Sequence, residues 1–582
     1  MRNKRFENYH QIQLDALYQV KRTIYVSLLC LLVGAISAFG AVGFKYLIEF
    51  FRNLLFHGKL SFSVERAHYS SRYTYLVIII PAVGITIANW LTTKWAPEAK
   101  GHGVPEVMAA VLKRDGKIRS QVALVKTLAS AITIGAGGSV GKEGPIVQIG
   151  AGFGSTLAQA FKLTSRETII LVGAGVAGGI SATFNAPIGG IMFALELILP
   201  EYSIMTIMPL VVSAVTSTAV ATLFTGIHPA FNIPPYTLNS PYELFFYAIL
   251  GIAAGFLSVA FIKLVYKLED LVDSIKVHFL VKTTVGGIIV GLIGFLCFNL
   301  FGSYYIFGVG YDFIDVMLDN QITFLWVALL LIILKLIANS VTLATGGSGG
   351  IFAPSLFLGS ALGGAFGIIV NQLLPNMGTS VAAYAIVGMA AMVSGVTGGV
   401  LTAIIMVFEM TRNYAVMLPL MLSSVIAFLC AKLLYEETMY TEKLTRRGIQ
   451  VDFDKQLPLL KSLVVTDIMK KELISCTSDE STESVLQKMH SKKLGLLPVI
   501  DNNEVIGTVG YPQLYGSSDV TIASHIEKKE ITIPKYATLW DALKIMRKLK
   551  SNILIACDGN EIVGFITANS IFWTYMDRRE RT

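Results

Sequence analysis

The feature that most constrains this chain is a succession of apolar stretches, recurring from Thr23 to about Leu434, that are long enough to cross a lipid bilayer. About 20 mainly apolar residues in a helix span the hydrocarbon core. The hydrophobic share of 53% and the mean hydropathy of +0.62 exceed what a soluble core requires. Beyond Leu434 the chain carries Lys, Asp and Glu at the density of soluble proteins. The sequence therefore predicts a multi-pass helical membrane domain followed by a soluble domain.

The apolar stretches are uneven in length. The first, at 23–56, is longer than one simple span and predicts a strongly tilted helix. Others, at 122–134, 168–180 and 385–393, are shorter than a span and have glycines or prolines at their ends. Broken helices are tolerated at membrane depth only inside protein or beside a water-filled path. This pattern is typical of a transport protein.

An internal repeat favours the same interpretation. The runs Gly-Val-Ala-Gly-Gly-Ile-Ser from Gly175 and Gly-Met-Ala-Ala-Met-Val-Ser from Gly388 both lead through an apolar stretch to a glutamate. The glutamates are Glu196 and Glu409, and each lies 21 positions after its glycine. We interpret the segments as two copies of one unit, with a structural role for both glutamates. The alternative is a chance likeness between glycine-rich membrane helices.

Charge predicts the orientation. Lys443, Arg446 and Arg447 follow closely after the last apolar stretch, and basic residues beside a span favour the cytoplasmic side. The first 22 residues are polar, and no short apolar core with a cleavage site precedes the first span, so we expect a cytoplasmic N-terminal tail. The net charge of +8 belongs to such flanking residues, and we expect no nucleic-acid partner.

Other function classes lack their motifs. The five cysteines show neither paired nor metal-ligand spacing, so we expect no disulfide framework and no metal site. No P-loop supports an ATP-driven pump, and no pattern indicates an enzyme. A transporter of metal ions would need carboxylates clustered at membrane depth, and the sequence offers few.

Three short segments combine glycine and proline where a helix could begin: Gly101–Pro105 (GHGVP), Gly141–Pro145 (GKEGP) and Gly350–Pro354 (GIFAP). A helix start leaves backbone N–H groups exposed at the positive end of the helix dipole, where they attract anions. Several weak donors suit the passage of chloride, because tight binding would stop conduction. One such segment alone is more typical of packing or of a kink. Three of them, one with an ionisable Glu143 at membrane depth, predict a shared anion site.

In this order, and with Tyr440 after them, the segments resemble the signatures of the CLC family of chloride channels and proton/chloride exchangers, which read roughly GSGIP, GK/REGP and GxFxP. The run Phe184-Asn185-Ala186-Pro187 is family-like as well, and the resemblance covers nearly the whole chain. It implies an all-α polytopic membrane domain of two inverted-repeat halves with broken helices. It also implies a homodimer in membrane lipid, in which each subunit encloses its own path for chloride and similar anions.

The resemblance further implies roles for single residues. Glu143 would be the gating glutamate, whose carboxylate competes with chloride for the outer part of the path. The anion-binding set would comprise His102, Gly103, Gly144, Ile351, Phe352 and Tyr440. Ile351 and Phe352 would offer backbone N–H groups while their side chains pack, and Tyr440 would offer its hydroxyl. The alternatives are a helix-capping role for Glu143 and an interfacial position for Tyr440.

Two departures from the family pattern bear on mechanism. His102 stands where the family commonly has a serine, so the inner donor would be an imidazole N–H that brings pH dependence near neutrality, unless the ring is turned aside. Leu197 occupies the position of the exchangers' inner glutamate, and leucine cannot relay a proton. We therefore expect a gated, voltage-gated-type chloride channel, with a proton/chloride exchanger as the alternative. Lys142 and Tyr440 fit the chloride branch better than the fluoride-exporting branch.

The soluble part predicts two βαβ units in tandem. β-rich runs at 497–500 and 505–509 alternate with amphipathic helical patterns at 481–490 and 540–549. The units resemble CBS domains and together predict a cytoplasmic α/β tandem CBS pair that regulates the protein or stabilises the dimer.

The nucleotide-binding pattern of CBS domains is incomplete in this pair. In the CBS family a Thr or Ser and an Asp after the last strand often hold the ribose of an adenine nucleotide. Here the aspartate positions read Gln513 and Ser570, and only Thr567 remains. We therefore expect no cofactor, with weak nucleotide binding at Thr567 as the alternative.

These observations predict five parts of a multi-pass protein of the cell membrane: a cytoplasmic N-terminal tail at 1–22, a transmembrane domain at 23–437, a linker at 438–461, and CBS domains at 462–517 and 518–582.

Overall fold

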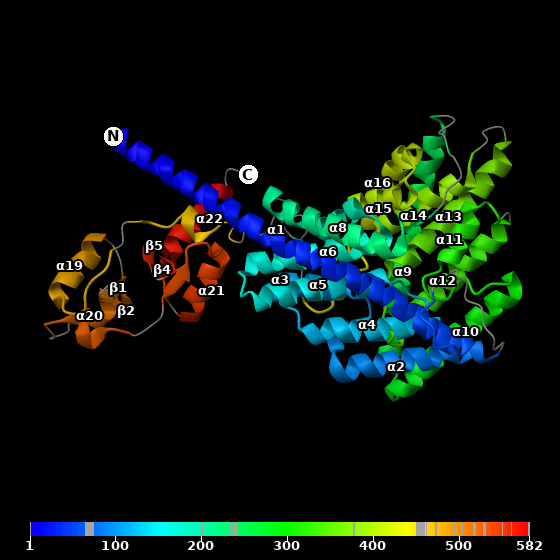
Figure 1. The fold of residues 1–582 in the computed structure, drawn as a ribbon, viewed down its shortest axis with the longest axis horizontal. Coiled ribbons are helices and arrows are strands. Elements are labelled where there is room, and N and C mark those ends of the chain that lie inside the picture. Colours follow the sequence, from blue (N-terminus) through cyan, green and yellow to red (C-terminus); the bar gives the residue numbers. More distant parts are fainter. Residues whose placement is uncertain are drawn as a thin grey trace. The chain divides into compact units, whose positions relative to one another are not determined.

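The computed structural model describes residues 2–63, 75–199, 203–227, 229–231, 236, 241–322, 324–375, 379–449, 460, 463–471, 474–492, 495–501, 504–515, 520–527, 531–549, 551–559 and 561–579. The chain folds as two compact units, Met1–Val451 and Asp452–Thr582. The first unit is helical and the second contains both helices and strands (Figure 1). The boundaries that we expect at 461/462 and 517/518 lie outside the described residues.

Within the described residues, nine helices are long and apolar enough to cross a membrane. They are α1 (Arg2–Arg52), α2 (Ile80–Trp95), α6 (Ser165–Phe184), α8 (Ile204–Thr225), α9 (Glu243–Ser274), α10 (Phe279–Phe301), α12 (Leu325–Ala344), α13 (Phe352–Leu373) and α16 (Met417–Leu434). The multi-pass membrane protein expected from the apolar stretches is thereby confirmed.

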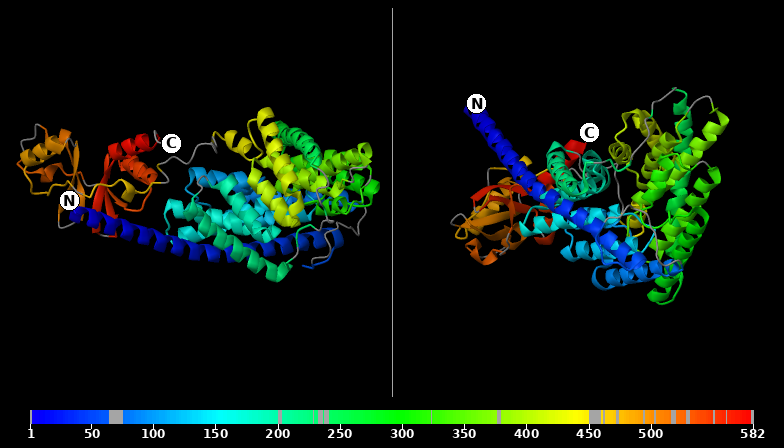
Figure 2. Two further views of the ribbon diagram at one scale, coloured as in Figure 1. Left: turned by 90° about the horizontal axis from the view of Figure 1, so that it is seen from above. Right: turned by 45° about the vertical axis from the view of Figure 1, so that its right-hand side comes forward.

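The long first helix is also confirmed. α1 has 51 residues and ends in a π-helical turn, η1 (Asn53–His57), so the polar tail at 1–22 continues the first span as one helix (Figure 2). The expectation that the stretch at 168–180 falls short of a span is wrong, because α6 has 20 residues. A capping box between Thr164 and Glu167 starts α6 earlier, and Asn185 in the left-handed region ends it later.

Shorter helices fill the first unit. They are α3 (Val104–Lys113), α4 (Ser120–Gly135), α5 (Glu143–Ala160), α7 (Pro187–Phe193), α11 (Tyr311–Leu318), α14 (Val381–Thr397), α15 (Val400–Thr411) and α17 (Thr441–Thr445). Two short helical turns adjoin these helices: the π-helical η4 (Ala194–Ile198) follows α7, and the 3₁₀-helical η3 (Pro97–Ala99) precedes α3.

The two copies of the repeat have the same packing. In one copy α5 crosses α6 so closely that a Cβ on Gly150 or on Gly175 would overlap the other helix's backbone. In the other copy α13 crosses α14 in the same way at Gly359 and Gly388. Small residues allow helices in a membrane to approach to backbone contact. The repeat predicted from Gly175 and Gly388 lies in α6–α7 and α14–α15, and the structure extends it by one helix in each copy, α5 and α13.

The contacts of the two glutamates show that the last helices of the two copies run in opposite directions. Glu196, at the end of the α7–η4 segment, accepts hydrogen bonds from Leu401 N (3.1 Å) and Thr402 N (2.7 Å) at the start of α15. Glu409, near the end of α15, accepts from Ile188 N (3.1 Å) and Gly189 N (2.6 Å) at the start of α7. Each helix therefore ends where the other begins, so α7 and α15 run antiparallel. These contacts agree with the structural role expected for both glutamates.

The second unit is built from two small α/β layers. The first pairs β1 (Leu496–Asp501) antiparallel with β2 (Glu504–Gly510) beside α19 (Thr482–Lys492) and α20 (Tyr511–Leu514). The second has the strand order β3 (Thr532–Pro534), β4 (Ile553–Asp558), β5 (Glu561–Thr567), with β3 parallel and β5 antiparallel to β4. Helices α21 (Leu539–Leu549) and α22 (Ala568–Arg579) accompany these strands. The expected tandem α/β architecture is confirmed.

Candidate functional site

The three glycine–proline segments meet in the middle of the first unit. Gly101 forms a parallel bridge with Ser348, and Gly141 forms an antiparallel bridge with Gly350 through two backbone hydrogen bonds of 2.8 and 2.7 Å. Gly103 approaches Gly144 so closely that a Cβ on Gly103 would lie 2.6 Å from the Gly144 oxygen. Helices α3, α5 and α13 begin at these segments, so three helix N-termini lie close together. Such an arrangement concentrates backbone N–H donors and positive dipole ends in one place.

The Glu143 carboxylate lies on the N-terminus of α13. The side chain is fully buried, and its Oε1 accepts a hydrogen bond of 3.0 Å from Ala353 N. A Cβ on Gly141 or on Gly350 would overlap this carboxylate, so both glycines are needed to make room for it. The second oxygen, Oε2, has no hydrogen-bond partner among the described residues. The Glu143 carboxylate thus occupies a backbone donor at the start of α13.

Ile351 and Phe352 are completely buried at the start of α13. The Phe352 ring packs against Phe184 and Phe193, with ring centroids 5.7 and 6.4 Å apart. Its side chain therefore serves the core, while the amide groups at this helix start lie beside the Glu143 carboxylate. The packing of the Phe352 side chain thus leaves the amide groups at this helix start free for the role expected of them.

Tyr440 stands immediately before α17 and is 1% exposed. Its hydroxyl has no hydrogen-bond partner within the part of the chain that the structure describes. A buried phenol normally finds a partner, because leaving the group unpaired costs about 1–3 kcal/mol. The free hydroxyl is thus available to a bound ion. Its burial argues against an interfacial position.

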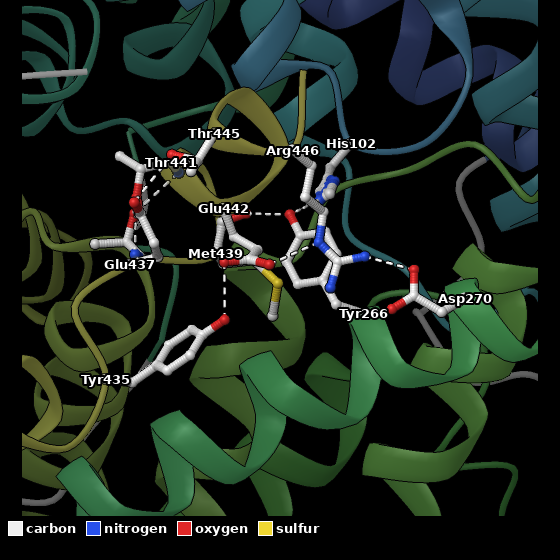
Figure 3. A network of polar contacts seen from close by, with 11 residues as sticks. His102, Tyr266, Asp270, Tyr435, Glu437, Met439, Thr441, Glu442, Thr445 and Arg446 are labelled. Atoms are coloured by element: carbon white, nitrogen blue, oxygen red, sulfur yellow. Dashed lines mark hydrogen bonds and ion pairs between the residues drawn. The ribbon is translucent and has the colours of Figure 1, made fainter. Parts of the chain in front are cut away.

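His102 is part of a polar network at the α3 end of the site (Figure 3). Its Nε2 lies 3.3 Å from the Tyr266 hydroxyl, and this hydroxyl lies 2.6 Å from the Met439 carbonyl oxygen. The Arg446 guanidinium stacks over the Tyr266 ring at 4.7 Å and forms ion pairs with Glu442 and Asp270. The segment after the last span is thereby fixed to α9 and to the His102 loop. The first part of the predicted linker, up to 449, hence packs within the first unit.

Sequence reasoning missed several members of this region. Lys126, in the short apolar helix α4, is completely buried and donates hydrogen bonds to the carbonyl oxygens of Ala99 and Gly101. A lysine in an apolar helix is itself a signal of function or of loop anchoring. The Lys443 Nζ lies so close to Gly101 that a Cβ there would be 2.8 Å from it. The role of Tyr266 could not be predicted from the sequence, because tyrosines are common in long apolar helices.

Leu197 is buried in η4, and a Cβ on Gly399 would lie 3.3 Å from its side chain. It has an apolar neighbourhood and carries no proton. The neighbouring Glu196 is engaged with the start of α15 and does not stand in for it.

In the second unit Thr567 and Ser570 bond to each other. Thr567 Oγ1 accepts from Ser570 N (3.1 Å), and Ser570 Oγ accepts from Thr567 N (3.1 Å) and donates to Thr567 O (2.8 Å). In the first βαβ unit, Gln513 makes a similar local hydrogen bond: its Oε1 accepts from Gly510 N (2.7 Å). The positions that differ from the nucleotide-binding pattern thus cap the helices that follow.

Comparison with known proteins agrees with this fold. The sequence model described as voltage gated chloride channel matches residues 84–432, and the CBS domain model matches residues 465–511 and 522–576. A ClcB-like protein of Ralstonia nicotianae, named as a chloride channel protein, is 31% identical over 63% of this chain and 85% of that protein. The H⁺/Cl⁻ exchange transporter ClcA of Salmonella paratyphi B is 29% identical over 75% of this chain and 91% of that protein.

Solved structures are similar as well. A slow cyanobacterial Cl⁻/H⁺ antiporter matches with a TM-score of 0.65 and 25% identity, covering 75% of this chain and 99% of its own. A eukaryotic CLC transporter matches with a TM-score of 0.60 and 18% identity, covering 94% of this chain and 98% of its own. The expected combination of a helical membrane domain and a tandem CBS pair is thereby confirmed.

Proposed function

Because this chain belongs to the family of voltage gated chloride channels, we propose that it transports chloride and exchanges it for protons. The observation that carries the proposal is the fully buried Glu143 carboxylate on the N-terminus of α13. Two relatives named as exchangers, the Salmonella transporter and the cyanobacterial antiporter, support exchange better than the passive channel expected from Leu197.

The chemistry follows from competition between two anions for the same donors. A deprotonated Glu143 is attracted by the amides at the start of α13 and excludes chloride from them. Protonation removes the charge, so the side chain leaves and a chloride takes its place. When the proton departs to the other side, the carboxylate returns and displaces the chloride. One side chain can thus link the movement of both ions in opposite directions.

The remaining anion ligands would be neutral. We assign the backbone N–H groups of Ile351 and Phe352 and the Tyr440 hydroxyl to a central chloride, with the helix starts at Gly103 and Gly144 on either side. Uncharged donors stabilise chloride without holding it, which rapid passage requires. His102 would contribute at the inner end.

A gated chloride channel is the second candidate. The observation that favours it is Leu197, because an apolar side chain stands where a proton-relaying glutamate is expected. The relative named as a chloride channel protein agrees with it.

The deciding experiment is the reversal potential of the purified protein in liposomes under opposed chloride and proton gradients. Exchange requires the reversal potential to shift with the proton gradient and the Glu143→Gln variant to lose this shift. A reversal potential that stays at the Nernst potential of chloride at every pH gradient would refute exchange and establish the channel.

We also propose a homodimer in which each subunit has its own path, located in the cell membrane with the N-terminus and the CBS pair in the cytoplasm. Lys443, Arg446 and Arg447 next to the last span support this orientation. The proposed domain limits remain 23–437 for the membrane domain and 462–517 and 518–582 for the CBS domains. Light scattering of the purified protein measures the stoichiometry, and labelling of single cysteines introduced at either end measures the orientation.

A further inference from the structure

Only one ring nitrogen of His102 has a hydrogen-bond partner among the described residues. Nε2 lies 3.3 Å from the Tyr266 hydroxyl, whereas Nδ1 has no hydrogen-bond partner among the described residues. The side chain is only 3% exposed, so water from the surface does not readily satisfy Nδ1. The loop that carries His102 starts α3, one of the three helix N-termini that meet at the anion site. An unpartnered nitrogen in such a place points to a ligand.

The hydrogen bonds of Tyr266 decide which nitrogen carries the proton. The phenol has a single hydrogen to donate. Its oxygen lies 2.6 Å from the Met439 carbonyl oxygen. Two oxygens approach that closely only with a hydrogen between them, so the phenol donates to Met439. The phenol oxygen then accepts from Nε2–H, and Figure 3 shows these residues side by side. In a neutral imidazole the second nitrogen, Nδ1, is consequently a lone-pair acceptor.

A lone pair repels a chloride, so the neutral ring cannot serve the anion. Nδ1 must first gain a proton, after which both nitrogens donate and the ring carries a positive charge. The serine that the family commonly has at this position needs no such step, because a hydroxyl donates while neutral.

The surroundings determine when this proton is held. The charged groups that act on the imidazole are Lys443 from α17, Lys126 from α4 and Arg447 after α17. The groups that act on its neighbours Tyr266 and Lys443 include Glu106, Glu269, Glu442 and Arg446. Arg447 holds Glu106, and Arg446 holds Glu442 and Asp270, while Lys126 and Lys443 both lie beside Gly101. Burial, the two lysines and Arg447 all oppose a further positive charge on the ring, so it stays neutral until an anion compensates that charge.

We propose that His102 links anion binding at the inner end of the path to the uptake of one proton at Nδ1. The proton comes from water on the adjoining aqueous side and forms an N–H bond at Nδ1. When the anion leaves, this bond breaks and the proton returns to water. Tyr266 acts as a positioning residue, because it keeps hydrogen on Nε2 and leaves Nδ1 empty. The inference rests on the proposed anion path but not on exchange itself, since a channel could contain the same proton-linked site.

The test is calorimetric titration of chloride into the purified full-length protein, carried out in the Glu143→Gln background so that the gating carboxylate does not titrate. Above the pH at which the free ring protonates, uptake of one proton per chloride means that the affinity falls about tenfold for each rise of one pH unit. Titrations in two buffers of different ionisation enthalpy count the protons directly. We expect close to one proton for each chloride that binds at the inner end of the path, and none for a chloride held by the neutral central ligands.

Two variants separate the explanations. His102→Ser should bind chloride with no pH dependence between about pH 5.5 and 7.5, because a hydroxyl donates without protonation. Tyr266→Phe retains the imidazole but frees its tautomer, so neutral Nδ1–H can donate and the pH dependence should also weaken. A pH-independent affinity in the Glu143→Gln protein, or an unchanged slope in His102→Ser, would overturn the proposal.

A spectroscopic measurement keeps the inference testable if a variant fails to fold. ¹⁵N NMR of the histidine-labelled protein distinguishes protonated from unprotonated ring nitrogens. Low chloride should give a neutral ring with hydrogen on Nε2, and high chloride at mildly acidic pH should give a doubly protonated ring. Hydrogen on Nδ1 of a neutral ring would contradict the role assigned to Tyr266. Failure of exchange appears only in the reversal potential, so the two proposals can fail independently.

Discussion

Removal of the Glu196 carboxylate should destabilise the contact between the two repeat halves. In Glu196→Ala the amides of Leu401 and Thr402 lose their acceptor, and the Thr402 hydroxyl loses a hydrogen bond of 2.7 Å. A cap replaced by alanine costs about 1–2 kcal/mol, and hydrogen bonds to a charged group are worth about 1.5–3 kcal/mol. We therefore expect a loss of about 2 kcal/mol in the free energy of unfolding. Glu409→Ala should cost slightly less, because two hydrogen bonds are lost there.

Thermal unfolding of the purified protein in detergent, followed by tryptophan fluorescence, provides the measurement. For a unit of roughly 450 residues, about 2 kcal/mol corresponds to a Tm lower by about 2 °C. Glu196→Gln retains an acceptor oxygen and should lose less than half as much, and Thr402→Val, which removes one hydroxyl only, serves as the matched control. Since both caps hold the same helix pair, the double alanine variant should lose less than the sum of the single losses. An unchanged Tm in Glu196→Ala would refute the reciprocal capping of α7 and α15.

Three further predictions concern other parts of the chain. In the His102→Ser background, Glu143→Gln should retain chloride flux into liposomes but lose its pH dependence, and a pH response equal to that of His102→Ser alone would exclude Glu143 as the gate. Gly350→Ala places a methyl group where the Glu143 carboxylate lies, so radiotracer uptake should become faster and less sensitive to pH; slower uptake with a normal pH response would contradict this. Burial raises the pKa of the Cys476 thiol to about 12, so a maleimide should label this cysteine only after unfolding, and mass spectrometry detects the difference.

The convergence of the three segments could be predicted from the sequence, because three possible helix starts, one of them with an ionisable glutamate at membrane depth, together indicate a shared site. The equal spacing of Glu196 and Glu409 likewise indicated equivalent positions. Their reciprocal contact could not be predicted, since it depends on the antiparallel packing of α7 and α15. The extent of α6 was missed although Thr164 and Glu167 form a recognisable capping box, because its glycines weakened the apolar pattern.

The neighbours of His102 could not be found in this way. Tyr266 lies 164 positions along the chain from His102, and its bond to Met439 spans a further 173 positions. Apolar periodicity marks which face of α9 is buried, but it does not identify the residue that a single hydroxyl on that face meets. The tautomer of the histidine, on which its proposed role depends, therefore required the packed structure.

The positions of the cations around the site explain how a path for anions can avoid trapping them. Lys126 directs its ammonium group to the carbonyl oxygens of Ala99 and Gly101, and Arg446 is engaged by Glu442 and Asp270. These charges hold the loop and the α17 segment in place, and their field still favours an anion nearby. In the proposed path, direct contact with chloride is left to neutral amides and the Tyr440 hydroxyl, whose weaker attraction would allow release. In this arrangement a ligand whose charge depends on a proton, such as His102, adds attraction only while the proton is bound.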